Sequence, residues 1–84
     1  MGVKVEVTAV RQVSEFVVAL SVAIDGNERV YRFVLDNRPP LATMLADEAL
    51  SRDIEEPSDY KALYAVVRRF LRGEPMVFPL RIRE

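Results

Sequence analysis

EFVVALSVAIDGNERVYRFVLD, residues 15–36, is the part of the chain with the clearest structural pattern. Between residues 15 and 24, large apolar side chains occupy the even positions and smaller or polar ones the odd positions. That alternation is typical of a strand with one buried face. Asp25 and Gly26 then supply the left-handed backbone that a tight type I′ turn needs. The stretch therefore predicts a β-hairpin.

The register of this hairpin follows from the length of its turn. A two-residue turn, or a four-residue loop of the same parity, sets Leu20 on the same face as Tyr31. A three-residue loop would oppose Leu20 to Arg32 and bury a charge, because a one-residue slip exchanges the two faces of a strand. The core face is therefore expected to carry Phe16, Val18, Leu20, Val22, Ile24, Tyr31, Phe33 and Leu35.

One strand is predicted before the hairpin. Residues 3–8 alternate valine with charged or polar residues, which indicates a strand with one face in water, and residues 11–14 form a break. After the hairpin the sheet is expected to stop at residues 36–40, where Pro40 suits the first turn of a helix. A short helical stripe follows, made of Leu41, Met44, Leu45 and Ala49.

The strongest helical pattern lies within residues 58–71. Ser58 is the expected N-cap, and Gly73 ends the helix. The apolar side chains at helical spacing are Tyr60, Leu63, Tyr64, Val67, Phe70 and Leu71. Residues 76–82 alternate again as a last strand, in which Pro79 favours an edge position because proline cannot donate to a central ladder.

These elements predict one small α+β domain over residues 1–84, in the order strand-strand-strand-helix-helix-strand. We expect a four-stranded antiparallel sheet with two helices on one face, the face of large side chains. Two consecutive helices carry the chain away and back. The last strand should therefore run antiparallel to the first and third strands, and lie at an edge beside one of them.

The chain contains neither histidine nor cysteine. Those side chains supply most metal sites and nucleophile–base pairs, so their absence excludes zinc sites built on them, thiol chemistry and Ser–His catalysis. The acidic residues between positions 47 and 59 lack the alternate spacing and glycine of a calcium loop. The sequence therefore predicts a protein that is not an enzyme and that needs no cofactor and no metal.

The longest apolar stretch, residues 16–24, is shorter than the roughly 20 residues that span a bilayer. The first residues alternate charge with valine and lack the apolar core of a secretion signal. A cytoplasmic protein without a membrane partner is the resulting expectation.

The outer face of the hairpin is the leading candidate for a binding surface. It is small and half apolar, whereas a fully solvated sheet would carry Thr, Lys and Glu. Its residues are Val17, Ala19, Ser21, Val30, Arg32 and Val34. We expect a non-catalytic protein-interaction module, with a homodimer as the simplest assembly. The alternative that strand propensity alone explains these residues remains open.

A basic stripe suggests a second interpretation, a nucleic-acid-binding domain. Its residues lie on the predicted second helix and last strand: Lys61, Arg68, Arg69, Arg72, Arg81 and Arg83. Arginine is suited to forked phosphate contacts. The chain has a net charge of −1 and no recognition motif, however, and basic residues in the last turns of a helix also favour its dipole. Nucleic acid is therefore the less favoured partner.

Overall fold

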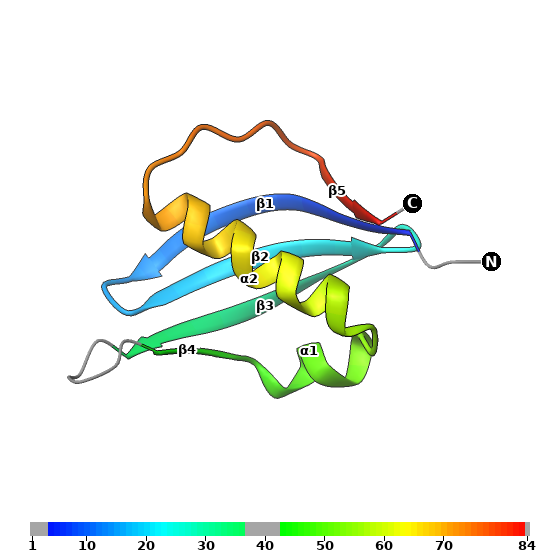
Figure 1. Ribbon diagram of the computed structural model, residues 1–84, viewed down its shortest axis with the longest axis horizontal. Coiled ribbons are helices and arrows are strands. Elements are labelled where there is room, and N and C mark those ends of the chain that lie inside the picture. Colours follow the sequence, from blue (N-terminus) through cyan, green and yellow to red (C-terminus); the bar gives the residue numbers. More distant parts are fainter. Residues whose placement is uncertain (1–3, 37–42, 84) are drawn as a thin grey trace.

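The computed structural model describes residues 4–36 and 43–83 (Figure 1). Within them, five strands form one antiparallel sheet in the spatial order β4-β3-β2-β1-β5. The strands are β1 (Val5–Ser14), β2 (Val17–Ile24), β3 (Asn27–Asp36), β4 (Thr43–Ala46) and β5 (Leu80–Arg83). Two helices, α1 (Glu48–Asp53) and α2 (Pro57–Leu71), connect β4 to β5. The α+β class is confirmed, but the sheet has five strands instead of the four predicted.

The predicted hairpin and its register are confirmed. β2 pairs with β3 so that Leu20 lies opposite Tyr31 and Val18 opposite Phe33. The turn is the two-residue one, because Ile24 lies opposite Asn27. Asp25 and Gly26 both have positive φ, 51° and 85°, as a type I′ turn requires.

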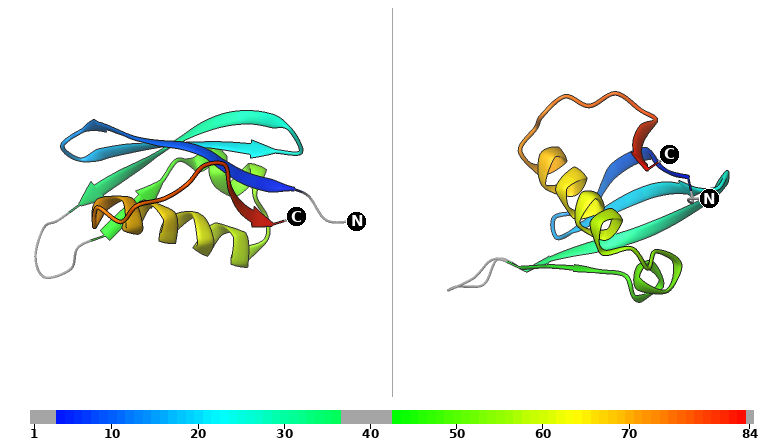
Figure 2. Two further views of the ribbon diagram at one scale, coloured as in Figure 1. Left: turned by 90° about the horizontal axis from the view of Figure 1, so that it is seen from above. Right: turned by 45° about the vertical axis from the view of Figure 1, so that its right-hand side comes forward.

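The core lies on the face of β1–β3 that carries the large side chains, and α2 crosses this face (Figures 1 and 2). Helix α2 contributes Leu63, Val66 and Val67 to the core, and α1 contributes Leu50. The Tyr64 ring meets the Phe33 ring edge-on, with 5.2 Å between centroids. The buried apolar side chains are Val5, Val7, Val18, Ala19, Leu20, Val22, Tyr31, Phe33, Leu50, Ile54, Leu63, Val66 and Val67.

The expectation that Phe16 belongs to the core is wrong, because 49% of this residue is exposed. Strand β1 does not end at residue 8 but continues to Ser14, so the turn into β2 falls at residues 15–16. Two register irregularities in β1, at residues 7–9 and 12–14, absorb the extra length. Phe16 therefore lies in the turn, outside the alternation of β2.

The helical stripe predicted from Leu41, Met44, Leu45 and Ala49 is wrong at Met44 and Leu45, whereas Ala49 does lie in a helix, α1. Residues 43–46 form β4, which pairs with the end of β3 and places Leu45 opposite Val34. The side chains alternate as in a strand: Met44 and Ala46 pack on the core, and Leu45 is 63% exposed. The open edge of β3 supplies hydrogen-bond partners that an isolated helical turn lacks. Leu41 and the two prolines before it lie outside the described residues.

Helix α1 begins only after Asp47, whose side chain accepts a hydrogen bond from the Ala49 backbone N–H at 3.2 Å. Helix α2 begins at Pro57, with Glu56 at the N-cap, so the prediction of Ser58 as N-cap is wrong. Proline is favoured in the first helical turn because its missing N–H would have no partner there.

The predicted inner face of α2 is confirmed in part. Leu63 and Val67 are buried, and Tyr60, Tyr64 and Phe70 pack against the core. Leu71 is 43% exposed, however, and the structure buries Val66 in the core instead. Gly73, with φ 75°, follows the helix as expected.

The last strand lies at an edge, antiparallel to β1, as predicted. It is shorter than expected, because only residues 80–83 are in the sheet. Helix α2 ends near the far end of the sheet, so residues 72–79 are used to carry the chain back to β1 (Figure 1). No helix in the described ranges is long and apolar enough to cross a membrane.

Candidate protein-interaction surface

The structure brings all six residues of the predicted partner surface together on the face of the sheet opposite the helices. We call this the outer face. Cross-strand pairing between β2 and β3 places Val17 opposite Val34. The remaining pairs are Ala19 with Arg32 and Ser21 with Val30.

Strand β1 widens this face by continuing the same cross-strand rows. Its register sets Glu6 opposite Ala23, Ala9 opposite Ser21 and Arg11 opposite Ala19. The result is three consecutive rows across β1, β2 and β3. They are an acidic row (Glu6, Ala23, Glu28), a small row (Ala9, Ser21, Val30) and a basic row (Arg11, Ala19, Arg32).

A fourth row crosses β2, β3 and β4, and we call it the apolar row: Val17, Val34 and Leu45. Val34 is 45% exposed and Leu45 63%. Sequence reasoning missed Leu45 because the segment around it was assigned to a helix. It missed the residues of β1 because that strand was expected to end before Ala9. Periodicity could not have revealed Leu45, because Met44, Leu45 and Ala46 are all apolar and do not alternate in sequence.

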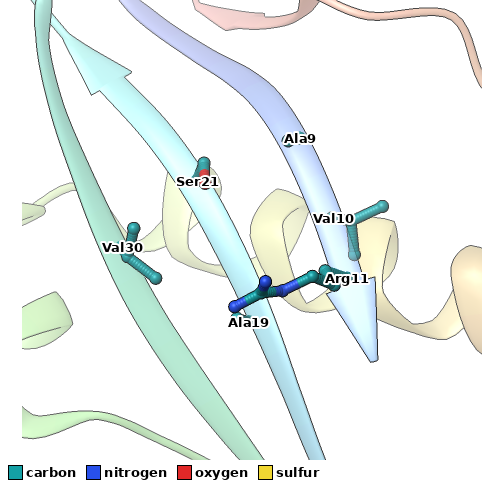
Figure 3. A pocket seen from close by; sticks show the side chains of 6 residues that line it. All are labelled: Ala9, Val10, Arg11, Ala19, Ser21 and Val30. Atoms are coloured by element: carbon teal, nitrogen blue, oxygen red, sulfur yellow. The ribbon is translucent and has the colours of Figure 1, made fainter. Parts of the chain in front are cut away.

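The middle of the outer face is hollowed by its small side chains. Figure 3 shows the Arg11 side chain lying across β2 above Ala19, which is only 7% exposed. The hollow of about 260 Å³ is lined by Ala9, Val10, Arg11, Ala19, Ser21 and Val30. Small-molecule sites usually measure about 300–1,000 Å³ and enclose their ligand. The hollow is smaller than this range.

The two charged rows differ in their contacts within the chain. In the acidic row, Glu6 is 3.3 Å from the Lys4 ammonium. The Thr8 hydroxyl lies 3.3 Å from the Glu28 carboxylate and 3.2 Å from the Ser21 carbonyl oxygen. In the basic row, neither Arg11 nor Arg32 forms an ion pair with any residue that the structure describes. The basic row therefore presents two charges available to a partner.

The structure does not gather the predicted nucleic-acid residues into one surface. Lys61 and Arg68 lie exposed on α2, which covers the inner face, and Arg72 is the exposed C-cap residue that follows this helix. Arg81 pairs in register with Glu6, and this places it on the outer face. The backbone of Arg83 ends β5. The basic residues are thus divided between opposite sides of the sheet.

Two of the helix arginines also have an acidic neighbour. Glu74 lies 2.5 Å from the Arg72 Nε and 3.8 Å from the Arg69 Nε. The guanidinium of Arg68 lies 6.0 Å from the centroid of the Tyr64 ring, within the range of a cation–π contact. These contacts stabilise the end of α2 and reduce the positive charge offered to a phosphate backbone.

One further polar cluster joins the sheet to α1. The Tyr31 hydroxyl donates a 2.7 Å hydrogen bond to Asp53 Oδ2, and Arg29 Nη1 lies 3.7 Å from the same oxygen. Burial, followed by the hydrogen bond to Asp53, raises the pKa of Tyr31 above its ordinary value. Tyr31 thus remains protonated at neutral pH and serves as a donor that holds α1 against β3.

Within residues 4–36 and 43–83, no three carboxylates lie close enough together to hold a metal ion. The acidic residues between positions 47 and 59 therefore do not form a carboxylate cluster there. The sequence matches no known protein-family model, and no curated protein is similar to it.

Proposed function

We propose that this chain is a non-catalytic module that binds a protein partner through the outer face of its sheet. The observation that supports this most is the apolar row, in which Val17, Val34 and Leu45 lie side by side on three strands. Exposed sheet faces usually carry polar side chains, and contiguous apolar residues on them mark interaction sites. Val30, at 59% exposure, extends the apolar surface toward the hairpin turn.

The chemistry of the face favours binding over catalysis. The rows offer alanine, valine, serine, arginine and glutamate, and the chain has neither the histidine nor the cysteine that most often acts as a base or nucleophile. Arginine is enriched at protein interfaces because its long stem packs on apolar surface while its guanidinium binds carboxylates. Arg11, lying flat across Ala19, presents both features.

Photo-crosslinking from single positions tests this proposal. A photoreactive amino acid replaces Val30 on the outer face, and in a matched control it replaces Lys61 on the exposed side of α2. We expect protein adducts from position 30, identified by mass spectrometry, and none from position 61. Absence of protein adducts at position 30 would contradict the proposal. Nucleic-acid adducts at position 61 would support the alternative based on the basic residues of α2.

A further inference from the structure

The charged rows of the outer face are arranged so that the face is complementary to a copy of itself. We propose that the partner is a second copy of this chain, stacked face to face with its strands antiparallel to those of the first. The two-fold axis passes through the small row (Ala9, Ser21, Val30). This inference rests on the proposed function and specifies its partner. The axis places the small row at the centre of the interface and the apolar row at its rim, over the hairpin turn of the other copy.

Strand β3 shows the complementarity most simply. Glu28, Val30 and Arg32 occupy alternate positions, so all three side chains point to the outer face. A strand rises about 3.3 Å per residue, which places Glu28 and Arg32 at equal distances of about 6.6 Å on either side of Val30. A two-fold axis perpendicular to the strands at Val30 therefore brings Glu28 of each copy opposite Arg32 of the other.

The neighbouring strands obey the same symmetry. On β1, Glu6 lies in the acidic row and Arg11 in the basic row, so the axis sets these residues opposite each other between copies. Lys4 and Arg81 lie beside Glu6 and offset its charge, so Glu28 and Arg32 of β3 contribute most of the complementarity. On β2, Ala19 and Ala23 lie in equivalent positions on either side of Ser21. Each strand thus matches its own copy about the same row.

Other two-fold arrangements of the face bring like charges together. A two-fold axis parallel to the strands keeps every residue at its position along the strand direction. Each row therefore meets the same row of the other copy, so acidic residues meet acidic residues and arginines meet arginines. An axis through the basic row sets Arg32 against Arg32. Like charges across an interface are costly, so charge selects the axis through the small row.

The small side chains of β2 make the approach of two sheets possible. Ser21 rises little above the backbone and lines the hollow with Ala9 and Val30, while Arg11 covers Ala19, so the free depth lies along the small row itself. Stacked sheets commonly cross at about 30°. The glutamate and arginine side chains are long enough to keep their contacts at that crossing angle. Arg32 has no ion-pair partner among the described residues, and Glu28 has only the Thr8 hydroxyl.

Charge reversal tests the axis directly, with sedimentation equilibrium as the measurement. Glu28→Arg sets an arginine against Arg32 of the other copy, and Arg32→Glu sets a glutamate against Glu28. Each contact occurs twice in a symmetric dimer, so each single variant is expected to weaken dimerisation at least about tenfold. The same charge reversal at the exposed Lys61, Lys61→Glu, is the matched control and should leave the dimer unchanged.

Two combinations make the test specific. The double variant Glu28→Arg with Arg32→Glu restores both pairs within a symmetric dimer, so it should dimerise like the unmodified chain. An equimolar mixture of the two single variants should form heterodimers, because one chain then carries arginine at both positions and the other carries glutamate. Circular dichroism confirms that each variant is folded before association is measured.

A chain that remains monomeric at several hundred micromolar would overturn this inference. So would a dimer that the single reversals do not weaken, or single variants that fail to associate when mixed. The crosslinking at position 30 separates these failures from those of the proposed function. Adducts to a different protein would support the proposed interaction module and contradict a second copy as its partner. Absence of protein adducts would contradict both proposals.

Discussion

Valine occurs on both faces of the central hairpin, in different surroundings. On the inner face, Val18 is fully buried beneath α2. On the outer face, Val34 is 45% exposed and Val30 is 59% exposed. The inner valine stabilises the fold by leaving water, but the outer valines gain much less from folding. The comparison shows that burial in the core accounts for the inner valine, whereas the apolar side chains of the outer face are not explained by burial within the chain.

The largest expected effect is on the inner face. Phe33 is fully buried and in edge-on contact with Tyr64, so Phe33→Ala should lower the free energy of unfolding by about 3–5 kcal/mol. Its neighbour Arg32 points to the outer face, and Arg32→Ala should cost less than about 1 kcal/mol. Urea denaturation of both variants measures the difference. Similar losses would show that the two faces do not differ as the structure indicates.

A smaller effect is expected where the inner face meets α1. Tyr31→Phe removes the hydrogen bond to Asp53 and should lower the free energy of unfolding by about 1–2 kcal/mol at neutral pH. Arg29 remains beside the carboxylate and limits the loss. Denaturation midpoints at pH 7 give this difference, and no loss would mean that the hydrogen bond contributes nothing to holding α1.

The same substitution changes the pH dependence of stability. The raised pKa of Tyr31 means that the folded state keeps the phenolic proton more firmly than the unfolded state does. Its contribution is therefore complete below about pH 10, the ordinary tyrosine pKa, and is lost as the pH rises above that value. Thermal unfolding between pH 8 and 11 should show a steeper alkaline decline for the unmodified chain than for Tyr31→Phe. Parallel curves would assign the decline to other groups.

The smallest effect on stability is expected on the outer face. Val30→Thr keeps a β-branched side chain at an exposed position, so the free energy of unfolding should change by no more than about 0.5 kcal/mol. Because Val30 lies on the proposed two-fold axis, the same variant should dimerise more weakly than the unmodified chain. Urea denaturation and sedimentation equilibrium separate the two effects. A large loss of stability would place Val30 in the folding core of the monomer.

Sequence reasoning succeeded where the pattern is local. The Asp25-Gly26 turn and the parity of the strands around it are enough to predict which residues of β2 and β3 face each other. The six residues of the predicted partner surface follow from that register without any information on the rest of the molecule. The edge position and direction of β5 were also predicted correctly, although residues 72–79, and not the two helices, bring the chain back to β1.

Reasoning from the sequence failed where distant segments determine the outcome. Four residues are too few for periodicity to separate a strand from a helical turn, and Thr43–Ala46 is a strand because the edge of β3 binds it. Phe16 leaves the core because the pairing of β1 with β2 continues to Ser14.

The alternation of the hairpin determined its own turn, register and two faces, because the period of a strand and the φ angles of a turn are properties of consecutive residues. The acidic and basic rows depend instead on β1, whose bulge at residues 7–9 sets Ala9 and Arg11 on the outer face. A bulge exists only relative to the strand with which it pairs, and a row of side chains across the sheet requires three paired strands. The residues of the candidate surface on β2 and β3 could therefore be predicted from the sequence, whereas its acidic and basic rows form only when the sheet assembles.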